Sequence, residues 1–261
     1  MYVQSLREYY FTGGMPEAVK KHLETNDTVQ VREVQKEILL AYDKDISKHA
    51  PTNEAVRINQ VWKSIPAQLA KENRKFIYGA VRKGARAKDF EIAIQWLLDA
   101  GLVYKVDRVS KPGMPLGCYA DFASFKLYML DCGLLGAMND MPPSLMLLPN
   151  RMEESKGSFT ENFVCSQLQT CRNLPVFYYS KENSTQEVDF IVQHDTEIVA
   201  IEVKAEENLQ SKSLKSFHNE HPDVRCVRTS MADYRQEEWM DNVPLYAIRS
   251  YWKDADQAHG L

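Results

Sequence analysis

Residues 187–205, EVDFIVQHDTEIVAIEVKA, are the part of the sequence that most constrains the fold. Two short apolar segments flank the polar turn QHDTE, and this arrangement predicts two strands paired as a β-hairpin. The apolar residues of both strands are typical of a buried sheet. The strands nevertheless contain four charged residues, which are Glu187, Asp189, Glu202 and Lys204.

Alternation of side chains along a strand assigns these charges to faces. In the second strand, Glu202 and Lys204 are expected on the same face. In the first strand, Asp189 is expected to share a face with Ile191, and the opposite face is expected to hold Val188, Phe190 and Val192. Pairing across the turn would bring Asp189 within reach of Glu202. Glu187 is interpreted as a solvated strand end.

Two carboxylates that converge in apolar surroundings repel one another unless a positive charge lies between them. A divalent cation supplies that charge, and oxygen ligands favour Mg²⁺ or Mn²⁺. With such an ion held by Asp189 and Glu202, Lys204 would position a water or neutralise negative charge, which suits phosphodiester hydrolysis. The alternative is a surface hairpin whose two acids form ion pairs with Lys204 and its neighbours.

The composition is that of a soluble protein. The chain has 261 residues, 44% of them hydrophobic, and no apolar run approaches the roughly 18 residues of a membrane-spanning helix. The start MYVQSLREYY lacks the layout of a signal peptide, so we predict a cytoplasmic protein with no membrane partner. The five cysteines form no CxxC pair, which favours free thiols over disulfides or a zinc site.

Charge is distributed unevenly along the chain. Residues 54–112 contain twelve Lys and Arg against six Asp and Glu, a net charge of +6. Residues 151–261 contain twelve against nineteen, a net charge of −7. Such asymmetry indicates two modules with different tasks.

The helix and strand patterns divide the chain into three segments. Residues 1–50 are predicted to be helical, with a break at Gly13 and Gly14. Residues 51–140 contain helical patterns followed by two strand candidates, LVYKVDRV and FKLYML, in the order of a winged helix-turn-helix. Residues 150–255 read as helix, three strands, helix and strand, a small α/β module with a mixed sheet. The predicted fold class is therefore a multidomain α+β or α/β protein.

A winged helix-turn-helix can place its third helix in the major groove of DNA. Cations that come just before this helix are candidate phosphate contacts, namely Arg82, Lys83, Arg86 and Lys88. The alternative is that the module is a spacer between proteins.

The order of these motifs resembles a known family. Asp189, then Glu202 and Lys204, with Glu161 on the preceding helix, resembles the PD-(D/E)XK nuclease-like fold. The wider chain resembles the C-terminal region of the DUF4143 family of ATP-binding proteins, in which an AAA-type ATPase core precedes a winged helix and a nuclease-like domain. Within this resemblance, residues 1–50, which contain GGMPEAV, resemble the lid end of the ATPase core. The matching stretches are YYFTGGMPEAV, AYDKDISKH, KLYMLDCGLL, GSFTENFV, EVDFIV and IEVK, and they cover nearly the whole chain.

The resemblance implies a role for each of four residues. Asp189 and Glu202 would bind Mg²⁺ or Mn²⁺, Lys204 would be a catalytic lysine and Glu161 an accessory acid. Val188 stands where the family motif has proline. No GxxxxGK[ST] occurs, so we expect no nucleotide site, and any ATPase would be a partner or a core absent from this chain.

Two functions follow as predictions. The first is a metal-dependent deoxyribonuclease with a DNA-binding winged helix. The second is a non-catalytic regulatory module that binds DNA or protein and keeps a vestigial nuclease site. The acidic residues 151–261 favour the second function, because a net negative segment binds a polyanion poorly unless metal and the basic residues 54–112 compensate.

Overall fold

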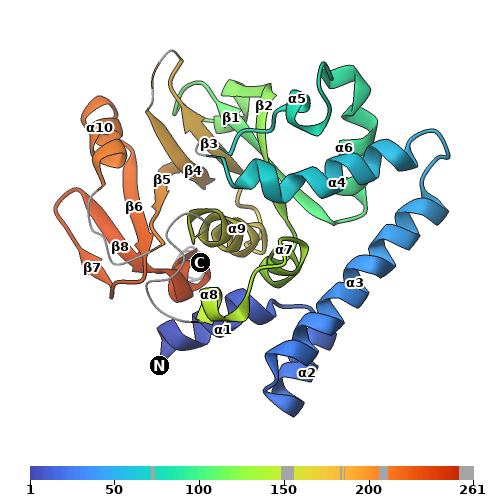
Figure 1. Cartoon of the computed structure of the whole chain (residues 1–261). Coiled ribbons are helices and arrows are strands. Elements are labelled where there is room, and N and C mark those ends of the chain that lie inside the picture. Colours follow the sequence, from blue (N-terminus) through green and yellow to red (C-terminus); the bar gives the residue numbers. More distant parts are fainter. Residues whose placement is uncertain (72–73, 148–155, 183, 185, 206–210, 253–261) are drawn as a thin grey trace. The chain divides into compact units, whose positions relative to one another are not determined.

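The computed structural model describes residues 1–71, 74–147, 156–182, 184, 186–205 and 211–252. They form two compact units, Met1–Lys105 with Leu127–Phe163, and Val106–Lys126 with Val164–Leu261 (Figure 1). The chain passes between the units within β1 (Val103–Val109), β2 (Ala120–Met129) and α9 (Lys156–Gln169). The predicted mixture of helices and a mixed sheet is confirmed. No described helix is both long and apolar enough to cross a membrane.

The first unit is mainly helical. It contains α1 (Tyr2–Thr12), α2 (Pro16–Thr25), α3 (Thr28–His49), α4 (Ala55–Leu69), α5 (Tyr78–Val81), η1 (Ala87–Asp89), α6 (Glu91–Asp99), α7 (Cys132–Met138) and α8 (Pro143–Leu147). The predicted break at Gly13 and Gly14 is confirmed, because α1 ends at Thr12. Pro16 begins α2, where its missing N–H costs no helical hydrogen bond.

The turn between α1 and α2 is held by the residue that caps α7. Asp131 accepts two backbone hydrogen bonds, from Leu134 N to Oδ1 at 2.8 Å and from Gly14 N to Oδ2 at 2.6 Å. Gly13 has a φ of 73°, and a Cβ there would overlap the Asp131 carboxylate. Glycine is therefore required at Gly13 both for its backbone angle and for its lack of a side chain. We call this contact the Asp131 junction.

The second unit is built around an eight-stranded sheet in the order β2-β1-β3-β4-β5-β6-β8-β7. Its further strands are β3 (Val176–Ser180), β4 (Glu187–His194), β5 (Glu197–Val203), β6 (Arg225–Ser230), β7 (Arg235–Gln236) and β8 (Met240–Pro244). The pairs β1–β3, β5–β6 and β6–β8 are parallel, and β3–β4, β4–β5 and β7–β8 are antiparallel. Helix α10 (Lys212–Glu220) buries Leu214 and Phe217 in a cluster with Ile191, Ala200 and Cys226.

The two strands predicted as a wing are present as β1 and β2. They are neighbours at one end of the sheet, and β1 also pairs with β3 in parallel, from Asp107 with Phe177 to Val109 with Tyr179. The strands therefore belong to a larger sheet. The winged helix-turn-helix and the segment boundaries stay predictions.

Candidate functional site

The predicted hairpin is formed by β4 and β5. Their antiparallel register runs from His194 opposite Glu197 to Phe190 opposite Ile201. The next positions along this register are Asp189 and Glu202, so the hairpin directs both acids to the same end of the sheet. There Asp189 accepts a hydrogen bond at Oδ2 from the backbone N–H of Val203, at 2.8 Å.

A β-bulge gives Asp189 this position. Phe177 pairs with Ile191 and Tyr179 with Val188, so two steps along β3 match three steps along β4. The extra residue of β4 lies between Val188 and Ile191, and a bulge locally turns the strand and redirects its side chains. The Asp189 carboxylate thus takes the place of a ladder acceptor at the end of β5.

The bulge also corrects one prediction about faces. Strict alternation placed Val188 on the face of Phe190 and Val192, opposite Ile191. In the structure Val188 and Ile191 pack in the same hydrophobic cluster, together with Tyr179. The prediction was wrong because one extra residue shifts the two-residue period of the strand.

Glu202 and Lys204 contact each other as the alternation predicts. Lys204 Nζ lies 3.0 Å from Glu202 Oε1, and Glu202 is only 6% exposed. The other oxygen, Oε2, is buried and has no hydrogen-bond partner among the described residues. A buried carboxylate oxygen without a donor is costly, and a bound cation would relieve that cost.

The Glu202 charge also affects its neighbours on the sheet. The pKa of the Cys226 thiol is raised to about 12, mainly by burial and in smaller part by the Glu202 charge, while Lys215 opposes the rise. Cys226 therefore stays a neutral thiol at neutral pH. It is a packing residue without nucleophilic character.

Sequence reasoning missed Arg228 on β6. Glu202 and Arg228 are register partners in parallel strands, so their side chains point to the same face. Arg228 is 1% exposed, donates to Asn242 Oδ1 at 2.9 Å and pairs with Glu237 Oε1 at 3.2 Å. The strand RCVRTS offered little sequence signal, because its only apolar residues are Cys226 and Val227 and the burial of Arg228 depends on the strands that pair with it.

Glu161, predicted as the accessory acid, lies on α9 in the first unit. It is 3% exposed, pairs with Arg74 Nη1 at 2.6 Å and accepts a hydrogen bond from the Tyr128 hydroxyl at 3.2 Å. The three other predicted site residues belong to the second unit. Glu161 is therefore a charge-paired residue in its own unit, and its accessory role stays a prediction.

Glu187, interpreted from the sequence as a solvated strand end, has a buried partner. Its Oε1 lies 2.5 Å from Nζ of Lys126, whose side chain is fully buried. Lys126 also lies over the ring of Tyr178, 4.8 Å from the centroid. The interpretation was wrong because Lys126 lies far from Glu187 in the sequence, and only the sheet brings the two together.

The candidate metal site contains two carboxylates and no more. Among the described residues, no three His, Cys, Asp or Glu side chains are grouped as metal ligands. Asp189 and Glu202 are hard oxygen donors, and Glu202 Oε2, which has no partner in the part of the chain that the structure describes, is the atom that best fits a divalent cation. Water completes the shell of Mg²⁺ where the protein offers few ligands, so two carboxylates suit this ion.

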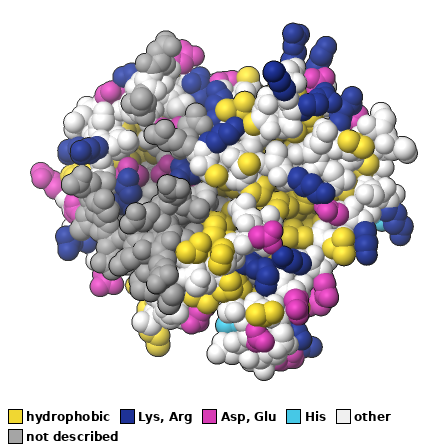
Figure 2. Space-filling model, viewed as in Figure 1, with side chains coloured by type: hydrophobic (Ala, Val, Ile, Leu, Met, Phe, Trp, Pro, Cys, Tyr) yellow, Lys and Arg dark blue, Asp and Glu magenta, His cyan; other side chains and the backbone are white. Residues whose placement is uncertain are grey.

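The candidate DNA contacts lie around α5 and η1 in the first unit. Arg82, Lys83, Arg86 and Lys88 are all exposed. Arg82 lies over the Phe90 ring at 5.5 Å. Figure 2 shows Lys and Arg side chains gathered in the upper right of that view, where Figure 1 draws α5 and its neighbours. The cations are thus available to a polyanion.

The fold and site define the class of this protein: a mixed α/β protein with a helical unit and a sheet unit that carries an acid-acid-lysine set. The chain belongs to the family described as Domain of unknown function (DUF8612), whose model matches residues 3–145, more than half of the chain. Residues 156–248 match Domain of unknown function (DUF4143), which confirms the predicted resemblance for this part. The earlier motifs, which the resemblance also assigned to DUF4143, lie within the DUF8612 match.

Similar solved structures add no functional argument. One is protein VC1899 from Vibrio cholerae, at 9% identity and a TM-score of 0.28, covering 95% of this chain and 59% of that one. Another is Can2 from Sulfobacillus thermosulfidooxidans in complex with cyclic tetra-adenylate, at 14% identity and a TM-score of 0.31, covering 85% and 55%. The chain thus spans less than three fifths of either. No curated protein matches the chain.

Proposed function

We propose that the second unit is a divalent-metal-dependent phosphodiester hydrolase that acts on DNA. The observation that carries this proposal is the buried Glu202 Oε2, which has no hydrogen-bond partner among the described residues. The other carboxylate oxygen, Glu202 Oε1, contacts Lys204, and Asp189 lies on the neighbouring strand β4. Acid, acid and lysine are the groups that metal-assisted hydrolysis needs.

Each residue has a distinct task in this proposal. Asp189 and Glu202 would hold the ion, which when bound polarises a phosphate oxygen and lowers the pKa of a water. The hydrogen bond from Val203 N to Asp189 fixes the backbone between Glu202 and Lys204, and so holds their relative position. Lys204, about one-third exposed, can exchange its contact with Glu202 for a water or a phosphate oxygen.

DNA would be held by the exposed cations of the first unit. Arg82, Lys83, Arg86 and Lys88 would contact phosphates without reading base sequence. Replacing Lys83 and Lys88 by alanine should weaken binding of a 20-base-pair duplex, and the slope of log affinity against log salt should fall by roughly two. An unchanged slope would argue against these contacts.

Metal binding is the first test. Calorimetric titration of the full chain with MnCl₂ should show one site, and Glu202→Gln and Asp189→Asn should each weaken it at least tenfold. Glu197→Gln is the matched control, because this exposed acid lies on the same strand. Equal Mn²⁺ binding by all four proteins, or none by the wild type, would contradict the proposed site.

Cleavage is the second test. The wild type should nick supercoiled plasmid DNA with Mn²⁺ or Mg²⁺ and not with EDTA, and Lys204→Met should abolish nicking while Mn²⁺ still binds. Glu161→Gln tests the accessory role, because a structural acid would lower stability and leave the rate per folded molecule unchanged. Nicking in EDTA would contradict a metal-dependent reaction.

One observation favours a second function, a non-catalytic module that binds DNA or protein. The described residues contain no group of three metal-ligating side chains, and Asp189 and Glu202 already have protein partners. DNA binding without Mn²⁺ uptake or cleavage would support this function. An ATPase partner rests on the resemblance alone and stays a prediction.

A further inference from the structure

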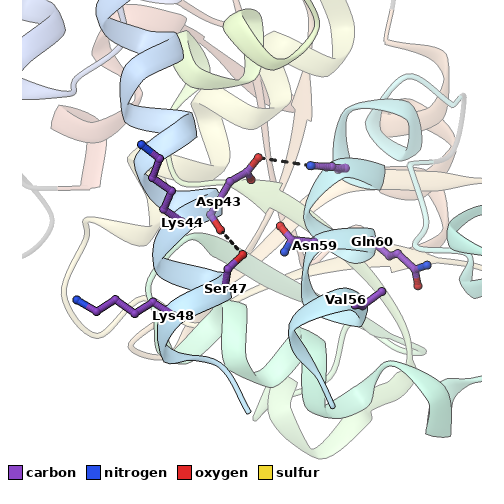
Figure 3. A pocket seen from close by; sticks show the side chains of 8 residues that line it. Asp43, Lys44, Ser47, Lys48, Val56, Asn59 and Gln60 are labelled. Atoms are coloured by element: carbon purple, nitrogen blue, oxygen red, sulfur yellow. Dashed lines mark hydrogen bonds and ion pairs between the residues drawn. The ribbon is translucent and has the colours of Figure 1, made fainter. Parts of the chain in front are cut away.

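An open groove runs between α3 and α4 in the first unit (Figure 3). Its volume is about 850 Å³. It is lined from α3 by Asp43, Lys44, Ser47 and Lys48, and from α4 by Val56, Asn59, Gln60 and Lys63. In Figure 3, Asp43, Ser47 and Asn59 point into the space between the helices, while Lys44 and Lys48 extend from the outer side of α3.

The groove is positively charged. It has three lysines against one acid, and the acid is already neutralised, since Lys63 Nζ lies 3.4 Å from Asp43 Oδ2. Lys44 and Lys48 are exposed and have no ion-pair partner within the described chain. The two lysines are one helical turn apart and thus form a short cationic row.

The groove is also flanked by exposed apolar side chains. Val56 on α4 is 65% exposed, and Leu40 on α3, one turn before Lys44, is 53% exposed. Ile38, Leu39 and Leu40 are consecutive, so they point in three directions about 100° apart on a helix. Ile38 and Leu39 are half-buried, and Leu40 is the one of the three that faces solvent. The lysine stems add further apolar surface beside it.

We propose that this groove binds an acidic amphipathic helix of a partner protein. Two helices with exposed residues at four-residue spacing present parallel rows into which a third helix can pack. Leu40 and Val56 would contact the apolar face of the incoming helix, and the lysines would pair with its acidic flanks. DNA fits less well, because its backbone offers nothing to the apolar residues and Asp43 faces the groove.

A designed peptide tests the proposal without knowledge of the natural partner. The probe is a fluorescein-labelled 18-residue peptide with leucines at helical spacing on one face and glutamates on the other. Two controls accompany it: the same composition in scrambled order, and an 18-base-pair DNA duplex. Fluorescence anisotropy with the full chain should show binding of the amphipathic peptide at least tenfold tighter than of the scrambled one, and no competition by the duplex.

Variants locate the binding surface. The double change Lys44→Glu and Lys48→Glu should weaken binding at least tenfold, and Val56→Ser about threefold. The matched control reverses the charge of two exposed lysines on α2 and α10 by the double change Lys20→Glu and Lys212→Glu. It should leave the affinity for the amphipathic peptide unchanged. Circular dichroism melting confirms that each variant is folded, and exposed lysines of this kind are not expected to alter it.

Three results would overturn the proposal. The first is equal binding of the ordered and scrambled peptides, which would indicate charge attraction alone. The second is displacement of the peptide by duplex DNA that requires Lys44 and Lys48, which would assign the groove to nucleic acid. The third is dimerisation of the wild type that Val56→Ser and Leu40→Ser abolish, which would assign it to a second copy of this chain.

Discussion

The Asp131 junction in the first unit and the Asp189–Glu202 pair in the second unit both contain buried carboxylates, and they differ in how fully these are satisfied. Both oxygens of Asp131 accept backbone N–H bonds. In Glu202, Oε1 forms an ion pair with Lys204, and Oε2 has no partner among the described residues. A carboxylate whose two oxygens both accept hydrogen bonds joins chain segments. A carboxylate with one oxygen unbonded retains the capacity to bind a ligand.

Replacing Arg228 should have the largest effect on the free energy of unfolding. It tests whether complete pairing of a buried charge also stabilises the sheet close to Glu202. Arg228→Met removes a buried cation and leaves Glu237 and Asn242 without it, which should cost about 4 kcal/mol. Urea unfolding measures the loss, with the exposed Arg235→Met as a control expected to change stability by about 0.5 kcal/mol or less. A loss from Arg228→Met no larger than the control would contradict the assigned network.

Asp131→Ala removes the carboxylate whose two oxygens both accept backbone hydrogen bonds. It leaves the N–H of the buried Leu134 and the N–H of the exposed Gly14 without their acceptor and should cost about 2 kcal/mol. The same urea series applies, and Asp99→Ala on the exposed end of α6 should be close to neutral. Equal stability of the Asp131 and Asp99 variants would show that the junction does not hold α1 to α7.

Glu202→Gln tests the carboxylate that has one oxygen without a hydrogen-bond partner among the described residues. It removes a buried charge together with one ion pair to a partly exposed lysine, so the two effects oppose each other and the net change should lie within about 1 kcal/mol. The expected small change in stability contrasts with the tenfold loss of Mn²⁺ affinity. A loss of several kcal/mol would make Glu202 a structural acid like Asp131.

The pH dependence of stability gives the smallest effect. Burial raises the pKa of Asp131, while hydrogen bonds from Gly14, Leu134 and Gly133 lower it, with a net rise. A raised folded-state pKa stabilises the fold most below the unfolded value of about 4, and this contribution is lost as pH rises through the folded value. The stability of the wild type relative to Asp131→Asn should therefore fall from pH 4 upward. A difference that grows with pH would contradict the sign.

Much of the site could be predicted from the sequence because its information is local. The hairpin and the contact of Glu202 with Lys204 follow from alternation across one short turn. The bulge in β4 could not be predicted, because the residue that creates it is defined only by the pairing with β3. The same holds for Lys126, whose partner Glu187 is distant in the sequence.

The sequence alone determined the β4–β5 hairpin, the break at Gly13, the charge asymmetry and the presence of an acid-acid-lysine set, since each can be read from the order of residues along the chain. Only the tertiary structure decided which of these acids are satisfied. Asp131 accepts a hydrogen bond from Gly14 across 117 positions, Glu161 pairs with Arg74, and one oxygen of Glu202 has no partner within the described part of the chain. The physical reason is that hydrogen bonding of a buried charge depends on the segments packed around it, and packing joins residues that the sequence keeps far apart.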